Sequence, residues 1–457
     1  MNRRTWVRLD NASNIFLGAM SDVDSKVFRL AAELAADVDP ALLQQALDAV
    51  FDEYVLYHSV LRRGVFWYYL EDSDLRPKVE PEVLPPCDHL YHFDRRELLF
   101  RVIHHRNRII LEVFHALSDG AGALLVFRDL VAHYIALRHP EDFPDQPASM
   151  GVKQALEKDS FTLYFHPGHA QAFADAAKSA PLDAGNRTGR LPEPGAHRPA
   201  LIGGLRRRGR QRVHRIRGTR TPDNRTRVVE LEMSTASVVQ LARAQGCSLT
   251  IYLTALFLKA VRVVDGALTN PTMAVSLPVD LRQHFPSDSA RNFFTTTRLE
   301  YTFGEGEDDL GAVCRSLREQ LRVQTTPEAL EAKLLKLIGF ELNPFTRGIP
   351  RPFKDVILGT VNRLSNRNLT VAISNLGQVQ FPGPVDSHVG AVFTHVSAAR
   401  PQFCVISRGD RLTVSFTSPF IETAHQKSFV RALTAQGVAV TMAASRVTAG
   451  EMEAARR

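Results

Sequence analysis

The segment 187–227 constrains the fold of this chain more than any other feature of the sequence. It contains thirteen arginines, only two acidic residues (Glu193 and Asp223) and few large apolar side chains. A segment of this composition cannot bury enough surface to offset the entropy lost on ordering. Strand-like and helix-like patterns stop near residue 179 and resume near residue 226. We therefore expect two folded lobes, residues 1–178 and 226–457, joined by a disordered linker or crossover at 179–225.

The charge of the chain is concentrated in the same segment. Residues 187–227 carry a net charge of +11, so the other residues sum to −4 and the whole chain to +7. Basic segments can bind nucleic acid or anionic membranes through phosphate contacts. This one lacks the aromatic residues that stack on bases, so we do not expect nucleic-acid binding. A solvated linker explains the arginine-, proline- and glycine-rich composition. An altered reading frame near 180–212 is an alternative explanation, because the composition there differs from that of its surroundings.

The cysteines and the apolar runs indicate a cytoplasmic protein. The four cysteines lie far apart without a C-x-x-C pair: Cys87, Cys247, Cys314 and Cys404. This usage fits a reducing compartment and predicts neither a disulfide framework nor a zinc site. The other histidines show no metal-ligand spacing, so no metal is expected. No apolar run reaches the roughly 18 to 20 residues that span a bilayer, and the N-terminus lacks the apolar core of a signal peptide.

Both lobes alternate between strand and helix patterns, which predicts the α/β (α+β) class with two layered lobes of similar build. Strands are expected at 26–36, 60–71, 97–105, 108–115, 226–234, 272–282, 368–379 and within 391–417. Helices are expected at 40–58, from 120 onward, at 235–246, 248–264 and 308–324, and from about 422. A tight turn at Arg106-Asn107 should join two of the strands, since Asn tolerates a positive φ.

His115 is the first candidate for chemistry. It ends an apolar strand pattern, and Asp119 and Gly120 follow just before a helix pattern. A histidine at a strand end can accept a proton near neutral pH, because its ordinary pKa is about 6.5. Gly120 would let the backbone turn sharply. The alternative is that His115 is only a turn residue and Asp119 only a helix N-cap.

Three stretches in this sequence resemble one acyltransferase superfamily. "FHALSDGAG" (114–122) is similar to its H-x-x-x-D-G motif, "SLPVDLRQHFP" (276–286) to its V-D-x-R segment, and "ISNLGQVQFP" (373–382) to a late strand motif. The superfamily contains chloramphenicol acetyltransferase, the BAHD acyltransferases, polyketide-associated acyltransferases and condensation domains. "LDNASNIF", "GVFWYYLE" and "SPFIETAHQKSF" look most like bacterial alcohol acetyltransferase-like proteins.

The resemblance implies two chloramphenicol-acetyltransferase-like lobes, each a two-layer sandwich, with the active site in a tunnel between them. An acyl group, acetyl or another short chain, would pass from acyl-CoA to an alcohol without a covalent acyl-enzyme. His115 would be the general base, and Asp119 would pair with Arg282 to shape the site and join the lobes. Ser374 and Asn375 are the candidates for stabilising the oxyanion.

Some alternatives remain open at this point. Phe114 stands where condensation domains carry a second histidine, and the BAHD D-F-G-W-G string is absent, which favours a free-standing alcohol acyltransferase. The donor could instead be an acyl carrier protein docked on the arginine-rich segment, or the chain could be a binding protein without turnover. Arg282 could be a surface residue, and Asn375 a plain turn residue. The aromatic row 66–69 is interpreted as packing and not as a substrate platform.

Overall fold

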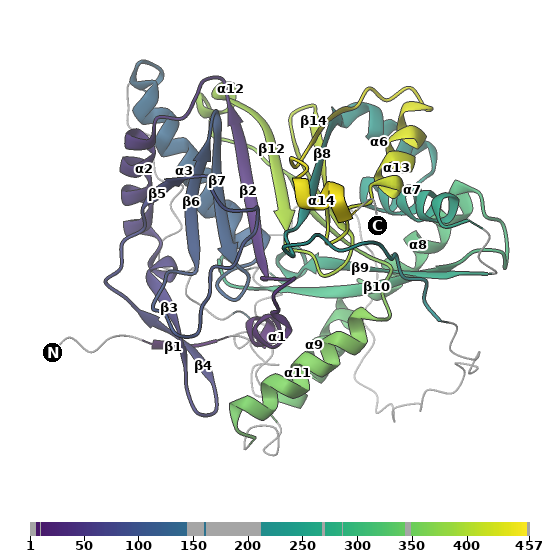
Figure 1. Ribbon diagram of the computed structural model, residues 1–457, viewed down its shortest axis with the longest axis horizontal. Coiled ribbons are helices and arrows are strands. Elements are labelled where there is room, and N and C mark those ends of the chain that lie inside the picture. The colour runs from purple at the N-terminus through teal and green to yellow at the C-terminus, as the bar shows by residue number, and fades with distance from the viewer. Residues whose placement is uncertain are drawn as a thin grey trace, which may run out of the picture.

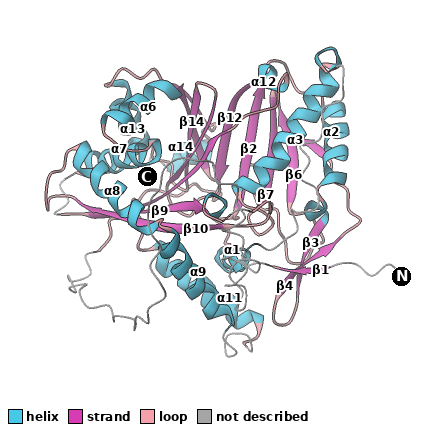
Figure 2. Cartoon of the chain, turned by 180° about the vertical axis from the view of Figure 1, so that it is seen from behind, coloured by secondary structure: helices cyan, strands magenta, loops and turns pink. Residues whose placement is uncertain are grey.

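The computed structural model describes residues 6–9, 11–143, 160, 212–266, 270–285, 287–342 and 349–454. Within these ranges, a five-stranded sheet forms the first lobe, in the order β12-β2-β7-β6-β5. Its strands are β2 (Val27–Leu34), β5 (Val79–Pro81), β6 (Phe100–His105), β7 (Arg108–Phe114) and β12 (Val389–Val396). The helices α2 (Pro40–Glu53) and α3 (Gly120–Arg138) cover one face of this sheet (Figure 2).

A seven-stranded sheet forms the second lobe, in the order β10-β9-β11-β13-β14-β8-β15. Its strands are β8 (Arg227–Ser234), β9 (Thr272–Asp280), β10 (Phe294–Thr302), β11 (Val371–Gln378), β13 (Gln402–Arg408), β14 (Arg411–Ser418) and β15 (Thr441–Ala444). Helices α6 (Thr235–Ala244), α7 (Leu249–Val264), α8 (Leu310–Gln324) and α13 (Ala424–Thr434) lie on the outer side of this lobe (Figure 1). The α/β class and the two-lobe architecture are confirmed.

A small third sheet, β1-β4-β3, lies at one edge of the molecule. It consists of β1 (Trp6–Arg8), β3 (Ser59–Arg63) and β4 (Tyr68–Asp72). Beside it lie α1 (Asn11–Ala19) and α11 (Arg351–Asn366), with α9 (Pro327–Leu342) next to α11 (Figure 1). The short helices α12 (Val385–His388) and α14 (Ala449–Ala454) complete the named helices of the described chain, apart from single 3₁₀ turns.

Local signals account for several of these elements. Asp39 caps α2 by accepting from the amides of Ala41 and Leu42, and Pro40 occupies the first turn. The turn between β6 and β7 is present, but the positive φ falls on Arg106, at 50°, and not on Asn107. Asn107 instead donates its side-chain amide to the carbonyl oxygen of Leu34, which ties the turn to β2.

Two expectations differ from the structure. The single strand expected at 60–71 is a hairpin, because the amide of Gly64 donates to the carbonyl oxygen of Trp67 and turns the chain between β3 and β4. The division at residue 226 does not separate the sheets, because β12 pairs with β2 in the first lobe. Residues 212–225 of the expected linker are placed beside the second lobe through bridges to Thr272 and Phe420, whereas 179–211 lie outside the described residues.

One helix in the described part of the chain, α3, is long and apolar enough to cross a membrane. The helices α6 and α7 pass the same test as a pair, although they are bent by 80°. In α3, 56% of the most apolar window is buried inside the protein, where it packs against α2 and the five-stranded sheet. This is the pattern of a core helix.

Candidate active site

His115 lies immediately after β7, where the two large lobes meet. Its amide donates to the carbonyl oxygen of Lys26 at 2.8 Å, which fixes the turn against the start of β2. Lys26 itself has a positive φ of 58°. The strand end thus presents the imidazole toward Asn292, which belongs to the second lobe and lies 177 residues further along the chain.

Hydrogen bonds to Asn292 select the tautomer of His115. The side-chain Nδ2 of Asn292 donates to the Oγ of Ser13 at 2.9 Å and to the carbonyl oxygen of His115 at 2.8 Å. The Oδ1 of Asn292 is therefore left as an acceptor, 3.3 Å from the Nδ1 of His115. Because Oδ1 cannot donate, the proton belongs on Nδ1, and Nε2 keeps its lone pair. Sequence reasoning assigned no role to Asn292.

Aromatic rings surround the imidazole. The ring of Phe16, from α1, stacks on it with centroids 4.0 Å apart, and Phe28 and Phe294 lie at 5.0 and 5.7 Å. Burial among these rings lowers the pKa of His115 to about 4, although the charge of Asp119 acts in the opposite direction. The residue as a whole is half-buried. At neutral pH this is an uncharged base.

Asp119 performs two structural tasks. Its Oδ1 accepts from the amide of Gly122 at 2.8 Å and caps α3. Its Oδ2 accepts from the Nη1 of Arg282 at 2.9 Å and from the amide of Phe293 at 2.8 Å. The expected pair of Asp119 with Arg282 is therefore present, and both side chains are largely buried. The N-cap interpretation and the ion pair do not exclude each other, because the carboxylate of Asp119 caps α3 and also pairs with Arg282.

Arg282 is held on several sides. Its Nη2 donates to the carbonyl oxygens of Ser289 and Arg291 at 2.8 and 2.7 Å, and its Nη1 also contacts Asp280 at 3.1 Å. These bonds gather the loop after β9 onto the start of α3. Arg282 is thus a buried connector between the lobes and not a surface arginine.

Glycines allow the two lobes to approach at the start of α3. A Cβ on Gly122 would lie 2.1 Å from the carbonyl oxygen of Ala290, so only glycine fits there. Gly120 does not have a positive φ, and its expected role in a sharp turn is wrong. Instead, a Cβ at Gly120 would lie 2.6 Å from the Cδ2 of Leu376, which brings β11 close to the motif.

The two residues expected to stabilise an oxyanion lie on β11. The Nδ2 of Asn375 donates to the Oγ1 of Thr250 at 2.7 Å, and its Oδ1 accepts from the amide of Gly377 at 2.8 Å. This amide is engaged in the turn that ends the strand, as in the alternative interpretation. Ser374 lies on the same strand and pairs in register with Cys404 of β13. The role of both residues at an oxyanion stays a prediction.

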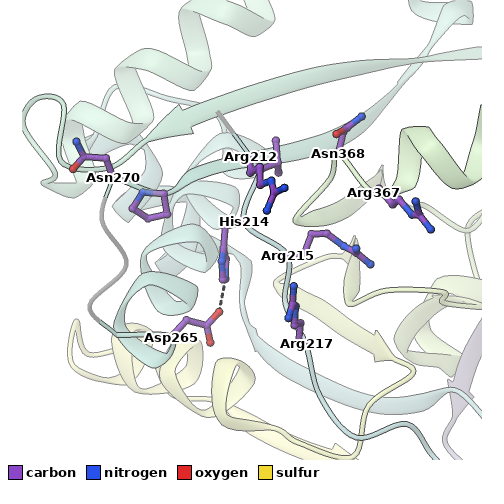
Figure 3. Close-up of a pocket in the computed structure, with 10 residues that line it drawn as sticks. Arg212, His214, Arg215, Arg217, Asp265, Asn270, Arg367 and Asn368 are labelled. Carbon is purple, nitrogen blue, oxygen red and sulfur yellow. Dashed lines mark hydrogen bonds and ion pairs between the residues drawn. The ribbon is translucent and has the colours of Figure 1, made fainter. Parts of the chain in front are cut away.

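A cavity of about 1280 Å³ lies at the start of β9, near Thr272, whereas Arg282 follows the end of this strand (Figure 3). It is lined by Arg212, Arg215, Arg217 and Arg367, and by His214, whose Nε2 lies 2.5 Å from the Oδ2 of Asp265. The nine residues of β9 run from Thr272, at this end, to Asp280 next to Arg282, a span of about 26 Å. The cavity is therefore separate from His115, and the expected tunnel between the lobes stays a prediction.

One group of side chains among the described residues has the arrangement of metal ligands. His139, Asp142 and His388 place one ligand atom each within 4.8 Å of the others, at the far end of α3 from His115. The two imidazoles stack with centroids 4.1 Å apart, and Asp142 lies 2.8 Å from the Nε2 of His388. The stack and the ion pair account for these side chains without an ion.

Comparisons with known proteins rest on structure alone. No family model and no curated protein matches the sequence. The fold matches polyketide synthase associated protein 5 from Mycobacterium tuberculosis, with a TM-score of 0.58, 14% identity and coverage of 94% of this chain and 98% of that one. It also matches the TRI3 trichothecene 15-O-acetyltransferase from Fusarium sporotrichioides, with a TM-score of 0.58, 10% identity and coverage of 95% and 94%.

A third similar structure is the first condensation domain of the CDA synthetase, with a TM-score of 0.58, 15% identity and coverage of 95% of this chain and 96% of that one. The chain has the fold of the chloramphenicol acetyltransferase and condensation-domain superfamily. The likeness extends over both lobes, as the three stretches of sequence indicated. Sequence identities of 10% to 15% within a shared fold establish the architecture of this chain and do not identify its substrate.

Proposed function

We propose that this chain is a coenzyme A-dependent O-acyltransferase that transfers an acetyl or other short acyl group to an alcohol. The geometry around His115 carries the proposal: the Oδ1 of Asn292 lies 3.3 Å from Nδ1 and favours the proton there, burial lowers the pKa of the imidazole to about 4, and Nε2 has no hydrogen-bond partner among the described residues. This is the state that a general base requires. The ion pair of Asp119 with Arg282 holds the turn that presents it.

The proposed reaction needs no covalent intermediate. The hydroxyl of the alcohol donates to Nε2 of His115, and its oxygen attacks the thioester carbonyl as the proton moves to the imidazole. The tetrahedral intermediate then expels the thiolate, which takes that proton from Nε2 and leaves as the free thiol. The stacked ring of Phe16 excludes water from one face of the imidazole, which disfavours hydrolysis of the thioester.

The pH dependence of the rate tests the protonation state of His115. Since the pKa of the imidazole is lowered to about 4, the base stays uncharged well below neutral pH. As the pH is lowered, we expect kcat/KM to fall only near pH 4 to 5, where the base becomes protonated, and not near pH 6.5. Folding stability should likewise fall as the pH drops from 6.5 toward 4, because the unfolded chain takes up the proton first. A fall in kcat/KM near pH 6.5, in protein that circular dichroism shows to be folded, would contradict this assignment.

A second candidate donor is an acyl group carried on an acidic carrier protein, and the arginine-lined cavity favours it. Among the described residues, Arg212, Arg215, Arg217 and Arg367 have no carboxylate partner, and the first three lie on one extended segment. Hydrogen bonds fix that segment, since the amide of His214 donates to the carbonyl oxygen of Thr272 at 2.7 Å. Unpaired guanidinium groups suit carboxylates and phosphates.

The two donors can be distinguished with one double variant. If a carrier docks at the cavity, Arg215→Gln with Arg217→Gln should raise KM for the carrier-bound thioester by about tenfold and leave KM for acyl-CoA unchanged. The control is Arg411→Gln, since Arg411 is 53% exposed and pairs with Glu232 on another part of the second lobe. Equal KM values for the carrier-bound donor in wild type and double variant would exclude docking at this cavity.

A further inference from the structure

The helix α11 exposes an apolar stripe to solvent. Residues at spacings of three, four and eight along a helix share one face. This outward face consists of Phe353, Val356, Ile357, Val361 and Leu364, which are between 45% and 69% exposed. Soluble proteins seldom expose contiguous apolar patches of this kind without an interaction partner. The outward face therefore requires an explanation that folding alone does not supply.

The opposite face of α11 makes the contacts with the protein. A Cβ on Gly18 of α1 would lie 2.7 Å from the Cβ of Leu358, and a Cβ on Gly359 would lie 3.0 Å from the carbonyl oxygen of Gly18. On the same side, Asp355 accepts from the hydroxyl of Tyr68 at 2.9 Å. The side that packs is thus formed by Leu358 together with small and polar groups, whereas the large apolar groups of the outward face point away.

The tip of the β3–β4 hairpin extends this apolar surface. The amide of Arg351 donates to the carbonyl oxygen of Val65 at 3.0 Å, and its Nε donates to that of Gly64 at 3.0 Å. Val65 is 72% exposed and Phe66 is 44% exposed. Figures 1 and 2 both show the small sheet and α11 at the same edge of the molecule. The hairpin tip and the outward face of α11 therefore form one surface that spans two elements.

The charges on this surface are positive. Lys354 lies 3.8 Å from the ring centroid of Trp67, and Arg363 is exposed beside the apolar stripe. Asp355 is the single acidic residue of α11, and it faces inward, where Arg351 and Tyr68 contact it. A helix with an apolar face, flanking cations and no outward acid is complementary to an anionic lipid surface. Phe and Trp near such cations also suit the headgroup region.

We propose that the outward face of α11 and the hairpin tip bind the surface of an anionic lipid bilayer. The stripe lies in the boundary between headgroups and acyl chains, and Lys354 and Arg363 contact the lipid phosphates. A surface that spans a helix and a hairpin suits a flat bilayer better than a groove that receives one helix. This binding is independent of the acyl-transfer proposal and needs no turnover for its test.

Vesicle sedimentation with the full chain tests the proposal. Wild-type protein should bind phosphatidylcholine vesicles containing about one third phosphatidylglycerol, and bind pure phosphatidylcholine much more weakly. Phe353→Ser with Ile357→Ser should weaken binding at least about tenfold, because two apolar side chains that would enter the bilayer are lost. Arg363→Gln should weaken binding to the anionic vesicles about fivefold, and added salt should do the same.

The matched control removes exposed apolar groups from helices elsewhere. Val263→Ser with Val323→Ser alters residues of α7 and α8 that are 73% and 54% exposed, and it should leave vesicle binding unchanged. Melting curves of all variants should match wild type, since every altered side chain is exposed. Absence of binding to the anionic vesicles, or equal binding by both double variants, would overturn the proposal. A dimer that dissociates only in the Phe353/Ile357 variant, without vesicle binding, would assign this surface to a second copy and overturn it too.

Discussion

Replacement of His115 by alanine should lower the rate of acyl transfer by a factor of about 10² to 10⁴, the range that a general base contributes. The proposal assigns the proton to Nδ1 of His115, beside the Oδ1 of Asn292, and leaves Nε2 as the uncharged acceptor. His115→Gln keeps much of the volume between the phenylalanine rings and should be equally inactive. The rates are measured by release of thiol from acyl-CoA in the presence of the alcohol.

The control for this prediction is His92→Ala. The side chain of His92 is 43% exposed and contacts only Glu97 among the hydrogen bonds described, so its loss should leave the rate unchanged. Circular dichroism and melting curves establish that both His115 variants remain folded. Full activity in a folded His115→Ala protein would remove the proposed base.

Replacement of Asp119 by alanine should lower the free energy of unfolding by about 3 to 5 kcal/mol, as expected when one partner of a buried ion pair is lost. The carboxylate of Asp119 joins the Nη1 of Arg282, the amide of Phe293 and the amide of Gly122, and thus connects both lobes to α3. The rate should fall as well, because the loop that supplies Asn292 is no longer held against His115. Chemical denaturation measures the first effect, and thiol release measures the second.

A double-mutant cycle isolates the pair. If Asp119 and Arg282 act together, Asp119→Ala with Arg282→Ala should be less destabilising than the sum of the two single changes. The exposed pair of Glu319 with Arg322 on α8 is the matched control, and Glu319→Ala should scarcely alter stability. A wild-type denaturation curve for Asp119→Ala would contradict the connecting role.

The sequence was sufficient for much of the local structure. Periodicity identified most strands of the two large sheets, though not β5, β10 or β15, and the helices that pack on these sheets. The turn at Arg106-Asn107 followed from its flanking patterns. Capping was equally local, since Asp39 and Ser234 accept from the first amides of their helices. The hairpin of β3 and β4 was missed because aromatic and β-branched residues continue on both sides of Gly64.

Long-range pairing was beyond local patterns. The strand β12 reads as part of the second half of the chain, but it pairs with β2 because register is set by contacts between distant residues. The helix α11 was missed for a different reason. Its apolar residues have helical spacing, but the search for elements looked for faces that pack in a core. None of the side chains of α11 is buried, so it has no such face.

The candidate site shows the same division. The resemblance of two stretches to the motifs of the superfamily implied that Asp119 and Arg282 pair, and the structure contains this pair. The role of Asn292 was not predictable from spacing, since its partners His115 and Ser13 are 177 and 279 residues away. Asn375 was assigned to an oxyanion, whereas both ends of its amide already bond to Thr250 and Gly377.

The most direct test of acyl transfer is simultaneous measurement of thiol release and ester formation with acetyl-CoA and a panel of alcohols, together with the intact mass of the protein. The account predicts that thiol appears only when an alcohol is present, in equal amount to the ester, and that the protein never gains the mass of an acyl group. Thiol release without an acceptor, an acylated protein, or no turnover with any alcohol would contradict it.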